Sequence, residues 1–337
     1  MAFEIIATGK AIPSNRVSNE DLSRRIETND EWIRSHSGIG ARHIADENTA
    51  SSDLALGAAR EALSMAAEKT GETPEELILS LDLIILGTAT PDYYGVPSTA
   101  CIVQAGLGAR NAAALDISAG CSGFIYCLEF AAGYLNLNPS RKRALVIGSE
   151  ILTRVTNWED RGTCVLFGDG AGAALLEQTA GPDKRGLLRT ILEADGAGAE
   201  SIINRRGGSR RPWKKGETVE TPSVLEMDGR AVYNFAVKAV TGTIEKLLAQ
   251  EGITIDQVDR IVPHQANARI VHAAGKRLGI PIEKFFLNIE EYANTSSASI
   301  PIALDELNRD GKIKKGDMIM TIGFGAGLTF GGNLIIW

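Results

Sequence analysis

The sequence predicts an α/β fold with a largely parallel core sheet, and three observations lead to this prediction. Apolar runs typical of buried strands occur at 83–86, 144–147 and 318–322. Segments at 55–69 and 232–250 carry apolar residues at helical spacing. Strand and helix patterns alternate along the chain, and this alternation is typical of a sheet covered by helices.

The composition is that of a folded globular chain with room for two domain-sized units. The 337 residues are 44% hydrophobic and 23% charged, which excludes a disordered, collagen-like or disulfide-scaffold protein. Lys and Arg number 35 against 42 Asp and Glu. The net charge of −7 makes a general nucleic-acid binder unexpected. Glycine, at 36 residues, is in excess.

The sequence also predicts a cytoplasmic protein without a membrane segment. Its first residues lack the basic and apolar regions of a secretory signal. Segment 318–337 has no charged residue, but its five glycines favour two buried strands around a Gly-rich turn over a membrane span. The 4 cysteines form no CxxC pair, as expected of free thiols in the cytoplasm.

Two parts of the chain resemble each other and predict two similar halves, 1–178 and 179–337. Segments 82–123 and 259–299 both begin with Asp and an apolar strand. Both continue through a helix that ends in Leu-Gly and reach a turn of small residues. We interpret this similarity as an internal duplication. Chance similarity of two strand–helix units is the alternative.

The duplication makes two turn residues equivalent, Cys121 in the first half and Asn294 in the second. Each half also ends near a similar Gly-rich segment, at 168–172 and 323–327. The turns before the two predicted helices would therefore occupy corresponding places in the fold. Residues on such corresponding turns can meet in one cleft.

Cys121 has the sequence context of a nucleophile. An apolar strand meets a turn of small residues there, and a helical run follows. At a helix N-terminus, the macrodipole and the free N–H groups favour a thiolate, and the flanking Gly120 and Gly123 permit close approach of a substrate. On this context alone, a buried structural cysteine remains the alternative. The other three cysteines lack the context and are expected in the core.

His264 and Asn294 complete a set suited to carbonyl chemistry. His264 follows the predicted strand at 261–263, a position where α/β folds place ligands and catalysts. A hydrogen-bonded structural histidine is the alternative. Asn294 by itself is typical of a helix cap or turn, and the duplication places it opposite Cys121. A cysteine nucleophile with histidine and asparagine donors suits the stabilisation of an oxyanion or enolate.

With these residues identified, the chain resembles β-ketoacyl-acyl-carrier-protein synthase III, of the thiolase-like superfamily, over essentially its whole length. The resemblance implies a thiolase-like fold, in which two similar halves form a layered α-β-α-β-α core. The matching motifs follow the family's order and lie at 30–33, around Cys121, and at 160–162, 167–172, 263–267, 294–299 and 323–327.

The resemblance implies a decarboxylative Claisen condensation that initiates fatty-acid synthesis. An acyl-CoA primer acylates Cys121, and malonyl-acyl carrier protein then binds. His264 and Asn294 stabilise the enolate formed on loss of CO2, and the carbanion attacks the thioester. The N–H groups of Cys121 and Ala326 would form the oxyanion hole, and the apolar Phe324 would favour decarboxylation by desolvation. No metal or organic cofactor is implied, because acyl-CoA and malonyl-acyl carrier protein are substrates.

The resemblance also implies binding residues. Trp32 and Arg154 match positions that clamp the CoA adenine, and Arg269 matches a residue that docks the carrier protein. Segment 204–215 carries six cationic residues and is expected to be a long exposed loop. A solvated loop and a docking surface for the acidic carrier protein both remain open. The docking candidates in this loop are Arg210, Arg211, Lys214 and Lys215.

Departures from the family pattern bear on the substrate. Val96 stands where many relatives carry Phe at the acyl-pocket wall near the dimer interface, which predicts a pocket roomier than acetyl needs. His36 replaces the family's usual Arg, and Ala293 replaces the usual Gly before Asn294. The resemblance further implies a homodimer.

Four other functions share part of this pattern. The first is a paralogous condensing enzyme or acyltransferase of secondary metabolism with a non-acetyl primer. A biosynthetic thiolase is disfavoured because the late Gly-rich motif contains no second cysteine. Type III polyketide synthases share the Cys, His and Asn but are usually longer. A non-catalytic acyl-binding or scaffold protein would not need the intact set of Cys121, His264 and Asn294.

Overall fold

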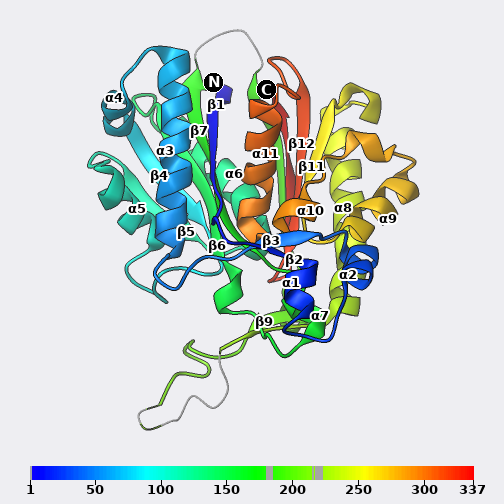
Figure 1. The fold of residues 1–337 in the computed structure, drawn as a ribbon. Coiled ribbons are helices and arrows are strands. Elements are labelled where there is room, and N and C mark those ends of the chain that lie inside the picture. The colour runs from blue at the N-terminus through cyan, green and yellow to red at the C-terminus, as the bar shows by residue number, and fades with distance from the viewer. Residues whose placement is uncertain (1, 180–184, 215, 217–222) are drawn as a thin grey trace.

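Two β-sheets form the framework of the molecule (Figure 1). The computed structural model describes residues 2–179, 185–214, 216 and 223–337. The first sheet has the strand order β1-β7-β6-β4-β5, and the second has the order β11-β12-β13-β8. The first is built from β1 (Ala2–Ala11), β4 (Leu81–Gly87), β5 (Ala113–Ile117), β6 (Arg143–Ile151) and β7 (Asp169–Thr179). The second is built from β8 (Gly186–Ala194), β11 (Arg260–Pro263), β12 (Met318–Gly325) and β13 (Thr329–Ile336).

The prediction of a largely parallel sheet is wrong, because both described sheets are mixed. Strand β4 runs parallel to β5 and β6, and β11 runs parallel to β12. The pairs β1–β7, β6–β7, β12–β13 and β13–β8 are antiparallel. Strands β12 and β13 confirm the two strands expected around the Gly-rich turn in 318–337. Such a short connection permits only antiparallel pairing.

Five layers result, in the order α-β-α-β-α, which confirms the expected fold class. Helices α3 (Ser51–Thr70) and α5 (Thr99–Leu107) pack on the outer face of the first sheet. Helices α8 (Gly229–Glu251) and α9 (Ala268–Leu278) pack on the second sheet. Between the sheets lie α6 (Gly123–Asn136) and α11 (Ser299–Arg309) (Figure 1). The predicted helices at 55–69 and 232–250 are parts of α3 and α8.

The alternation of apolar residues along the strands explains this layering. In β4, Leu83 and Ile85 pack in the core around α6 and α11, whereas Ile84 and Leu86 pack against α3 and α5. A strand points successive side chains to opposite faces, so a continuous apolar run fits a sheet covered on both faces. All nine residues of β6 are buried for the same reason.

Several smaller elements, among them β2, β3, α1, α2, α7 and β9, lie in the lower part of Figure 1. Strands β2 and β3 pair there, as do β9 and β10. No helix of the described residues is long and apolar enough to cross a membrane. The remaining strands and helices are β2 (Arg16–Ser18), α1 (Asn19–Ser23), α2 (Asp30–Ser37), β3 (Ala41–His43), α4 (Pro74–Leu79), α7 (Arg161–Cys164), β9 (Ile202–Asn204), β10 (Leu225–Met227) and α10 (Ile289–Tyr292). The 3-10 turns are η1 (Gly120–Ser122), η2 (Leu152–Arg154), η3 (Gly196–Ser201), η4 (Ile255–Gln257), η5 (Ile282–Lys284) and η6 (Ser296–Ala298).

The two central helices begin in the same way. Turn η1, which contains Cys121, leads into α6, and η6, which follows Asn294, leads into α11. The first sheet takes its strands from residues 2–179 and the second from 186–336. The two-half division at 178/179 remains our interpretation of this arrangement.

Candidate active site

Cys121 lies at the N-terminal end of α6, where the sequence predicts it. Gly120 has a φ of 50°, a left-handed conformation that glycine adopts without strain. A Cβ placed on Gly120 would lie 3.0 Å from Ala326 N, and a Cβ on Gly325 would lie 2.7 Å from Cys121 Cβ. The cysteine turn and the 325–326 backbone therefore touch, and glycine at both positions permits the contact.

The Cys121 thiol is buried enough to oppose its own ionisation. Burial raises its pKa from 9.0 to about 12 and is the largest effect. A hydrogen bond with the Ser296 side chain and the backbone N–H groups of Cys121 and Ala326 lower the pKa by less. The expectation that the helix start favours the thiolate is therefore outweighed by desolvation in this structure. The two N–H groups are those that the resemblance assigns to the oxyanion hole.

His264 is a buried and neutral imidazole at the end of β11. Its backbone N–H donates to Ile322 O at 2.7 Å, and its Nδ1 lies 2.7 Å from Ser299 Oγ. Phe324 packs edge-on with ring centroids 5.2 Å apart. Burial lowers the His264 pKa from 6.5 to about 3. At neutral pH the ring can therefore donate a hydrogen bond without carrying a charge.

Asn294 is held by both its backbone and its side chain. Its N–H donates to Leu166 O at 2.9 Å, and its carbonyl accepts from Gly168 N at 3.0 Å. Its Oδ1 accepts from Ser296 N at 2.8 Å. With Oδ1 engaged, the side-chain amide N–H group is the donor that Asn294 offers to its surroundings.

One cavity of about 250 Å³ brings the predicted chemical residues together. Its walls are mainly apolar, which strengthens hydrogen bonds to a developing charge. Among its lining residues are Cys121, His264, Asn294, Phe324 and Ala326. A nucleophile, two side-chain donors and a backbone donor thus face a single space, as the sequence predicts.

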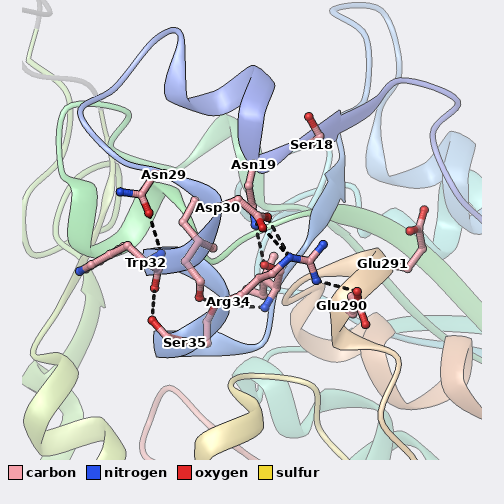
Figure 2. A network of polar contacts seen from close by, with 12 residues as sticks. Ser18, Asn19, Asn29, Asp30, Trp32, Arg34, Ser35, Glu290 and Glu291 are labelled. Atoms are coloured by element: carbon pink, nitrogen blue, oxygen red, sulfur yellow. Dashed lines mark hydrogen bonds and ion pairs between the residues drawn. The ribbon is translucent and has the colours of Figure 1, made fainter.

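Trp32 also lines this cavity, and a polar network fixes the helix that carries it (Figure 2). Asn29 caps α2 by accepting the Trp32 N–H at 2.7 Å. Arg34 on the same helix donates to Asp30 at 2.8 Å and to Glu290 at 2.6 Å. Because Glu290 lies on α10, just before Asn294, the network ties the Trp32 helix to the asparagine segment.

The cation over Trp32 is Arg161, whereas the resemblance names Arg154 as the partner of Trp32 at the adenine. The Arg161 guanidinium lies 3.9 Å from the Trp32 ring centroid. The Arg154 guanidinium instead donates to the carbonyls of Asp46, at 2.7 Å, and Thr49, at 3.1 Å. Arg161 belongs to the matched 160–162 motif, so the sequence contained a signal for this residue. A cation over an aromatic ring is a contact suited to an adenine clamp.

Val96 is not part of the cavity formed by this chain. Its residue surface is 85% exposed, and the lining residues of the cavity do not include it. In the single chain, Val96 therefore does not lie at the wall of the pocket where it is expected. A wall at this position requires a neighbouring surface to cover Val96.

The predicted docking residues lie at the surface. Arg269 is exposed in the first turn of α9, between the cavity-lining Asn267 and Ile270. Arg210, Arg211 and Lys214 are exposed in a segment without helix or strand, and Lys215 lies outside the described residues. The exposed loop expected at 204–215 is confirmed at 208–214, whereas Asn204 ends β9 and residues 206 and 207 are half-buried. Both interpretations of its charge remain open.

Three polar side chains near the catalytic candidates were not predicted from the sequence. Ser299 meets His264, and Ser296 meets both Cys121 and Glu150. The serines lie in the matched 294–299 motif. Glu150 had a separate signal, because it lies three residues after the apolar run 144–147, and a carboxylate so close to a buried strand is unusual.

The fold and the site together define a class of protein. A cysteine at a helix start, a neutral histidine and an asparagine around an apolar cavity, on a thiolase-like fold, describe an acyltransferase-type condensing enzyme. Residues 115–199 match the family model for 3-oxoacyl-[acyl-carrier-protein] synthase III, and residues 248–337 match the model for its C-terminal part. The chain belongs to the 3-oxoacyl-[acyl-carrier-protein] synthase III family.

Individual relatives agree with this membership. The chain is 46% identical to a β-ketoacyl-[acyl-carrier-protein] synthase III of Syntrophomonas wolfei, over 100% of this chain and 98% of that protein. It resembles the crystal structure of the synthase III of Aquifex aeolicus, with 42% identity, a TM-score of 0.88 and full coverage of both chains. It also resembles the priming β-ketosynthase of the R1128 polyketide pathway, with 32% identity, a TM-score of 0.87 and coverage of 99% and 96%.

Proposed function

We propose that this chain condenses an acyl-CoA primer with malonyl-acyl carrier protein through an acyl-Cys121 intermediate and so initiates fatty-acid synthesis. The observation that carries the proposal is the convergence of Cys121, His264 and Asn294 on one apolar cavity. Family membership supports the same reaction, because the relatives are named as synthases of this kind.

In the first half-reaction, Cys121 attacks the thioester carbonyl of the primer. The thiol loses its proton as the C–S bond forms, and the departing CoA thiolate takes up a proton. The N–H groups of Cys121 and Ala326 stabilise the oxyanion of the tetrahedral intermediate. Since burial holds the thiol in its neutral form, binding of the primer must promote the ionisation, and Ser296 assists through its hydrogen bond.

In the second half-reaction, the malonyl group loses CO2 and its C–C bond electrons form an enolate. His264 and the Asn294 amide donate hydrogen bonds to the enolate oxygen, and Phe324 keeps the surroundings apolar. The carbanion attacks the acyl-Cys121 carbonyl, and the cysteine leaves as the β-ketoacyl product forms. The neutral state of His264 suits this role, because an uncharged donor does not stabilise the malonyl carboxylate.

Intact-protein mass spectrometry after incubation with a panel of acyl-CoAs tests the proposal. We expect one acyl group per chain, absent in Cys121→Ala and retained in the control Cys101→Ala. The expected core location of Cys101 is wrong, because this cysteine is exposed, whereas Cys127 and Cys164 are buried. Addition of malonyl-acyl carrier protein should then discharge the acyl group as a β-ketoacyl product. A wild-type chain that acquires no acyl group from any acyl-CoA contradicts the proposal and favours a non-catalytic acyl-binding protein.

A second candidate is a paralogous condensing enzyme or acyltransferase of secondary metabolism with a non-acetyl primer. The similarity to the R1128 priming synthase and the presence of Val96 favour it. The same acyl-CoA panel separates the two, because the mass of the adduct identifies the primer. A uniform preference for acetyl-CoA over longer or branched primers would refute the prediction, from Val96, of an acyl pocket larger than acetyl needs.

The acyl carrier protein is proposed to dock at the cationic surface near the cavity mouth. Exposed Arg269, beside two cavity-lining residues, supports this site, since carrier proteins are acidic. Arg269→Glu should raise the KM for malonyl-acyl carrier protein and leave acylation by acyl-CoA unchanged. The double variant Arg210→Glu and Arg211→Glu tests whether the loop at 204–215 contributes to docking. An unchanged KM for malonyl-acyl carrier protein would mean that the loop is only solvated.

We also propose a homodimer formed through the edge of the first sheet. Strand β5 is that edge, and its Leu115 is 41% exposed. Tyr94, Val96 and Phe130 are also largely exposed apolar or aromatic residues. An unpaired edge strand with apolar neighbours is a template for pairing with another chain. A second copy would cover Val96, as a place at the acyl-pocket wall requires.

Three further expectations complete the proposal. The enzyme is proposed to act in the cytoplasm, without nucleic-acid partners, in keeping with its free cysteines and net charge of −7. The reaction is proposed to need no metal or organic cofactor, because protein groups supply each step. Dialysis against a chelator should therefore leave the condensation rate unchanged.

A further inference from the structure

A fully buried carboxyl group, Glu150, lies behind the nucleophile at the end of β6. Its Oε2 accepts from Thr90 Oγ1 at 2.6 Å and from Ala89 N at 3.0 Å. Its Oε1 lies 2.9 Å from Ser297 Oγ, in the turn that joins Asn294 to α11. Among the described residues, no lysine or arginine forms an ion pair with this carboxyl. A charge there would be buried without a counter-ion, which is costly.

The number of hydroxyl protons around Glu150 indicates that its carboxyl group carries a proton. Ser297 Oγ lies 2.7 Å from Gly87 O as well as 2.9 Å from Glu150 Oε1. A serine hydroxyl has a single proton, and a backbone carbonyl has none to offer. When the Ser297 proton points to Gly87, at the shorter distance, the second contact is a full hydrogen bond only if Glu150 supplies the hydrogen. The Thr90 hydroxyl accepts from Ile151 N at 2.9 Å, so its own proton faces Oε2.

The packing of the turn leaves no other place for Ser297. A Cβ on Gly148 would lie 2.3 Å from Ser297 O, and a Cβ on Gly123 would lie 3.2 Å from Ser297 Cβ. The serine is thus wedged between the strand that carries Glu150 and the start of α6. The Glu150–Ser297–Gly87 chain of hydrogen bonds ties this turn to β6 and to the end of β4, and the end of β4 packs on Gly123 at the start of α6.

Ser296 connects the same carboxyl to the nucleophile. Its side chain lies close to both groups, and its polar interaction lowers the pKa of Cys121 and of Glu150. Ser296 has one proton, so a charged carboxylate would compete with the Cys121 thiolate for it. A negative charge on Glu150 would also raise the pKa of Cys121 by Coulomb repulsion. A neutral acid removes both effects.

We propose that Glu150 remains a neutral carboxylic acid in the working enzyme and is a positioning residue. Its proton goes to Ser297, which holds the 294–299 turn against the Cys121 helix and leaves the Ser296 proton for the thiolate. Burial raises the pKa of Glu150, in agreement with this geometry. The role in condensation rests on the proposed function, whereas the protonation state does not.

Infrared spectroscopy of the whole enzyme at neutral pH tests the protonation state. We expect a carboxylic-acid carbonyl band that shifts when the protein contains isotope-labelled glutamate and disappears in Glu150→Gln. The labelled wild type gives a result even if the variant does not fold. The absence of any label-sensitive acid band at neutral pH would overturn the proposal.

The pH dependence of Cys121 alkylation by iodoacetamide tests the effect on the nucleophile. The titratable group that faces Glu150 is Cys121, reached through Ser296. Because the Gln amide can replace the acid as donor and acceptor, Glu150→Gln should alkylate with the wild-type pH profile and still accept the acyl group. Asp169→Asn is the matched control, since it removes a buried carboxyl that contacts Thr153 and Ala45 instead.

Two results of the Glu150→Gln experiments would overturn the inference. A profile shifted down by about one pH unit or more in Glu150→Gln would mean that the native carboxyl is charged. A folded Glu150→Gln that no longer forms the acyl-enzyme would mean that the acid takes part in proton transfer.

The variant Ser297→Ala tests whether Glu150 positions the 294–299 turn through Ser297. It leaves the Glu150 proton without its acceptor, so kcat for condensation should fall about tenfold or more with little change in KM. An unchanged kcat would remove the positioning role. A wild-type chain that never forms an acyl-enzyme would refute the proposed function instead, and the infrared and alkylation results would stand.

Discussion

His264 and Cys121 share one physical property, which is that burial keeps both uncharged near neutral pH. Desolvation lowers the pKa of the imidazole to about 3 and raises that of the thiol to about 12. A neutral imidazole suits an enolate donor, and a neutral thiol avoids side reactions until a primer is bound. The apolar cavity thus determines the protonation states on which the proposed chemistry depends.

The His264 shift predicts a loss of stability in acid. The folded pKa, about 3, lies below the ordinary 6.5, so the unfolded chain binds the extra proton first. The stabilisation is complete above about pH 6.5 and is lost as pH falls toward 3, at about 1 kcal/mol per pH unit. Urea unfolding at several pH values should show a weaker acid dependence in His264→Gln than in wild type. The exposed His272→Gln should keep the wild-type pH dependence. The prediction is wrong if the unfolding free energy of His264→Gln falls with decreasing pH as steeply as that of wild type.

The two arginines near Trp32 predict different effects on CoA binding. Arg161 stacks on the Trp32 ring, whereas Arg154 is engaged by two backbone carbonyls. Arg161→Ala should raise the KM for acyl-CoA about tenfold, as expected for a lost stacking and charge contact. Arg154→Ala should leave this KM nearly unchanged and serves as the control. The reverse pattern in steady-state kinetics would restore the assignment to Arg154.

At the scale of elements, the turn before α11 is strained. Ala293 has φ 56° and ψ −155°, a conformation that suits glycine and costs a residue with a Cβ about 1–3 kcal/mol. Ala293→Gly should therefore raise the free energy of unfolding by about 1 kcal/mol, measured by thermal or urea denaturation. Ala298→Gly, at an ordinary φ of −77°, should lower it. A less stable Ala293→Gly would show that the lost methyl packing outweighs the strain.

The contact between the cysteine turn and the 325–326 backbone predicts a second outcome. A Cβ on Gly325 would lie 2.8 Å from Cys121 N, and backbone atoms cannot move aside without displacing the nucleophile. Gly325→Ala should fold but lose acylation about a hundredfold or more, followed by mass spectrometry. Ala326→Gly keeps the N–H group and should acylate normally. Acylation of Gly325→Ala at the wild-type rate would rule out the tight contact.

At the scale of the whole molecule, the proposed dimer can be broken at one position. Leu115→Glu places a charge on the exposed edge strand β5 without touching the cavity. Sedimentation should show a dimer for wild type and a monomer for the variant. Exposed Leu137→Glu, outside β5, is the control and should remain dimeric. A wild-type monomer would refute the dimer and with it the shared pocket wall at Val96.

Much of the architecture was predictable because it follows from local patterns. Apolar runs at 83–86 and 144–147 became β4 and β6, and the segments at 55–69 and 232–250 became parts of α3 and α8. Strand direction was not predictable in the same way. An apolar run indicates burial on both faces, but mixed sheets covered by helices bury their strands equally well.

The sequence by itself determined the chemical residue types and their order. Cys121, His264 and Asn294 follow strands or precede helices, and a parallel arrangement of such turns makes them converge. Only the tertiary structure decided that Arg161 covers Trp32, that Val96 faces outward and that Glu150 lies behind the nucleophile. Those outcomes depend on contacts between segments distant in sequence and on the burial they create. Burial in turn sets the charge of each group, which residue spacing along a chain does not encode.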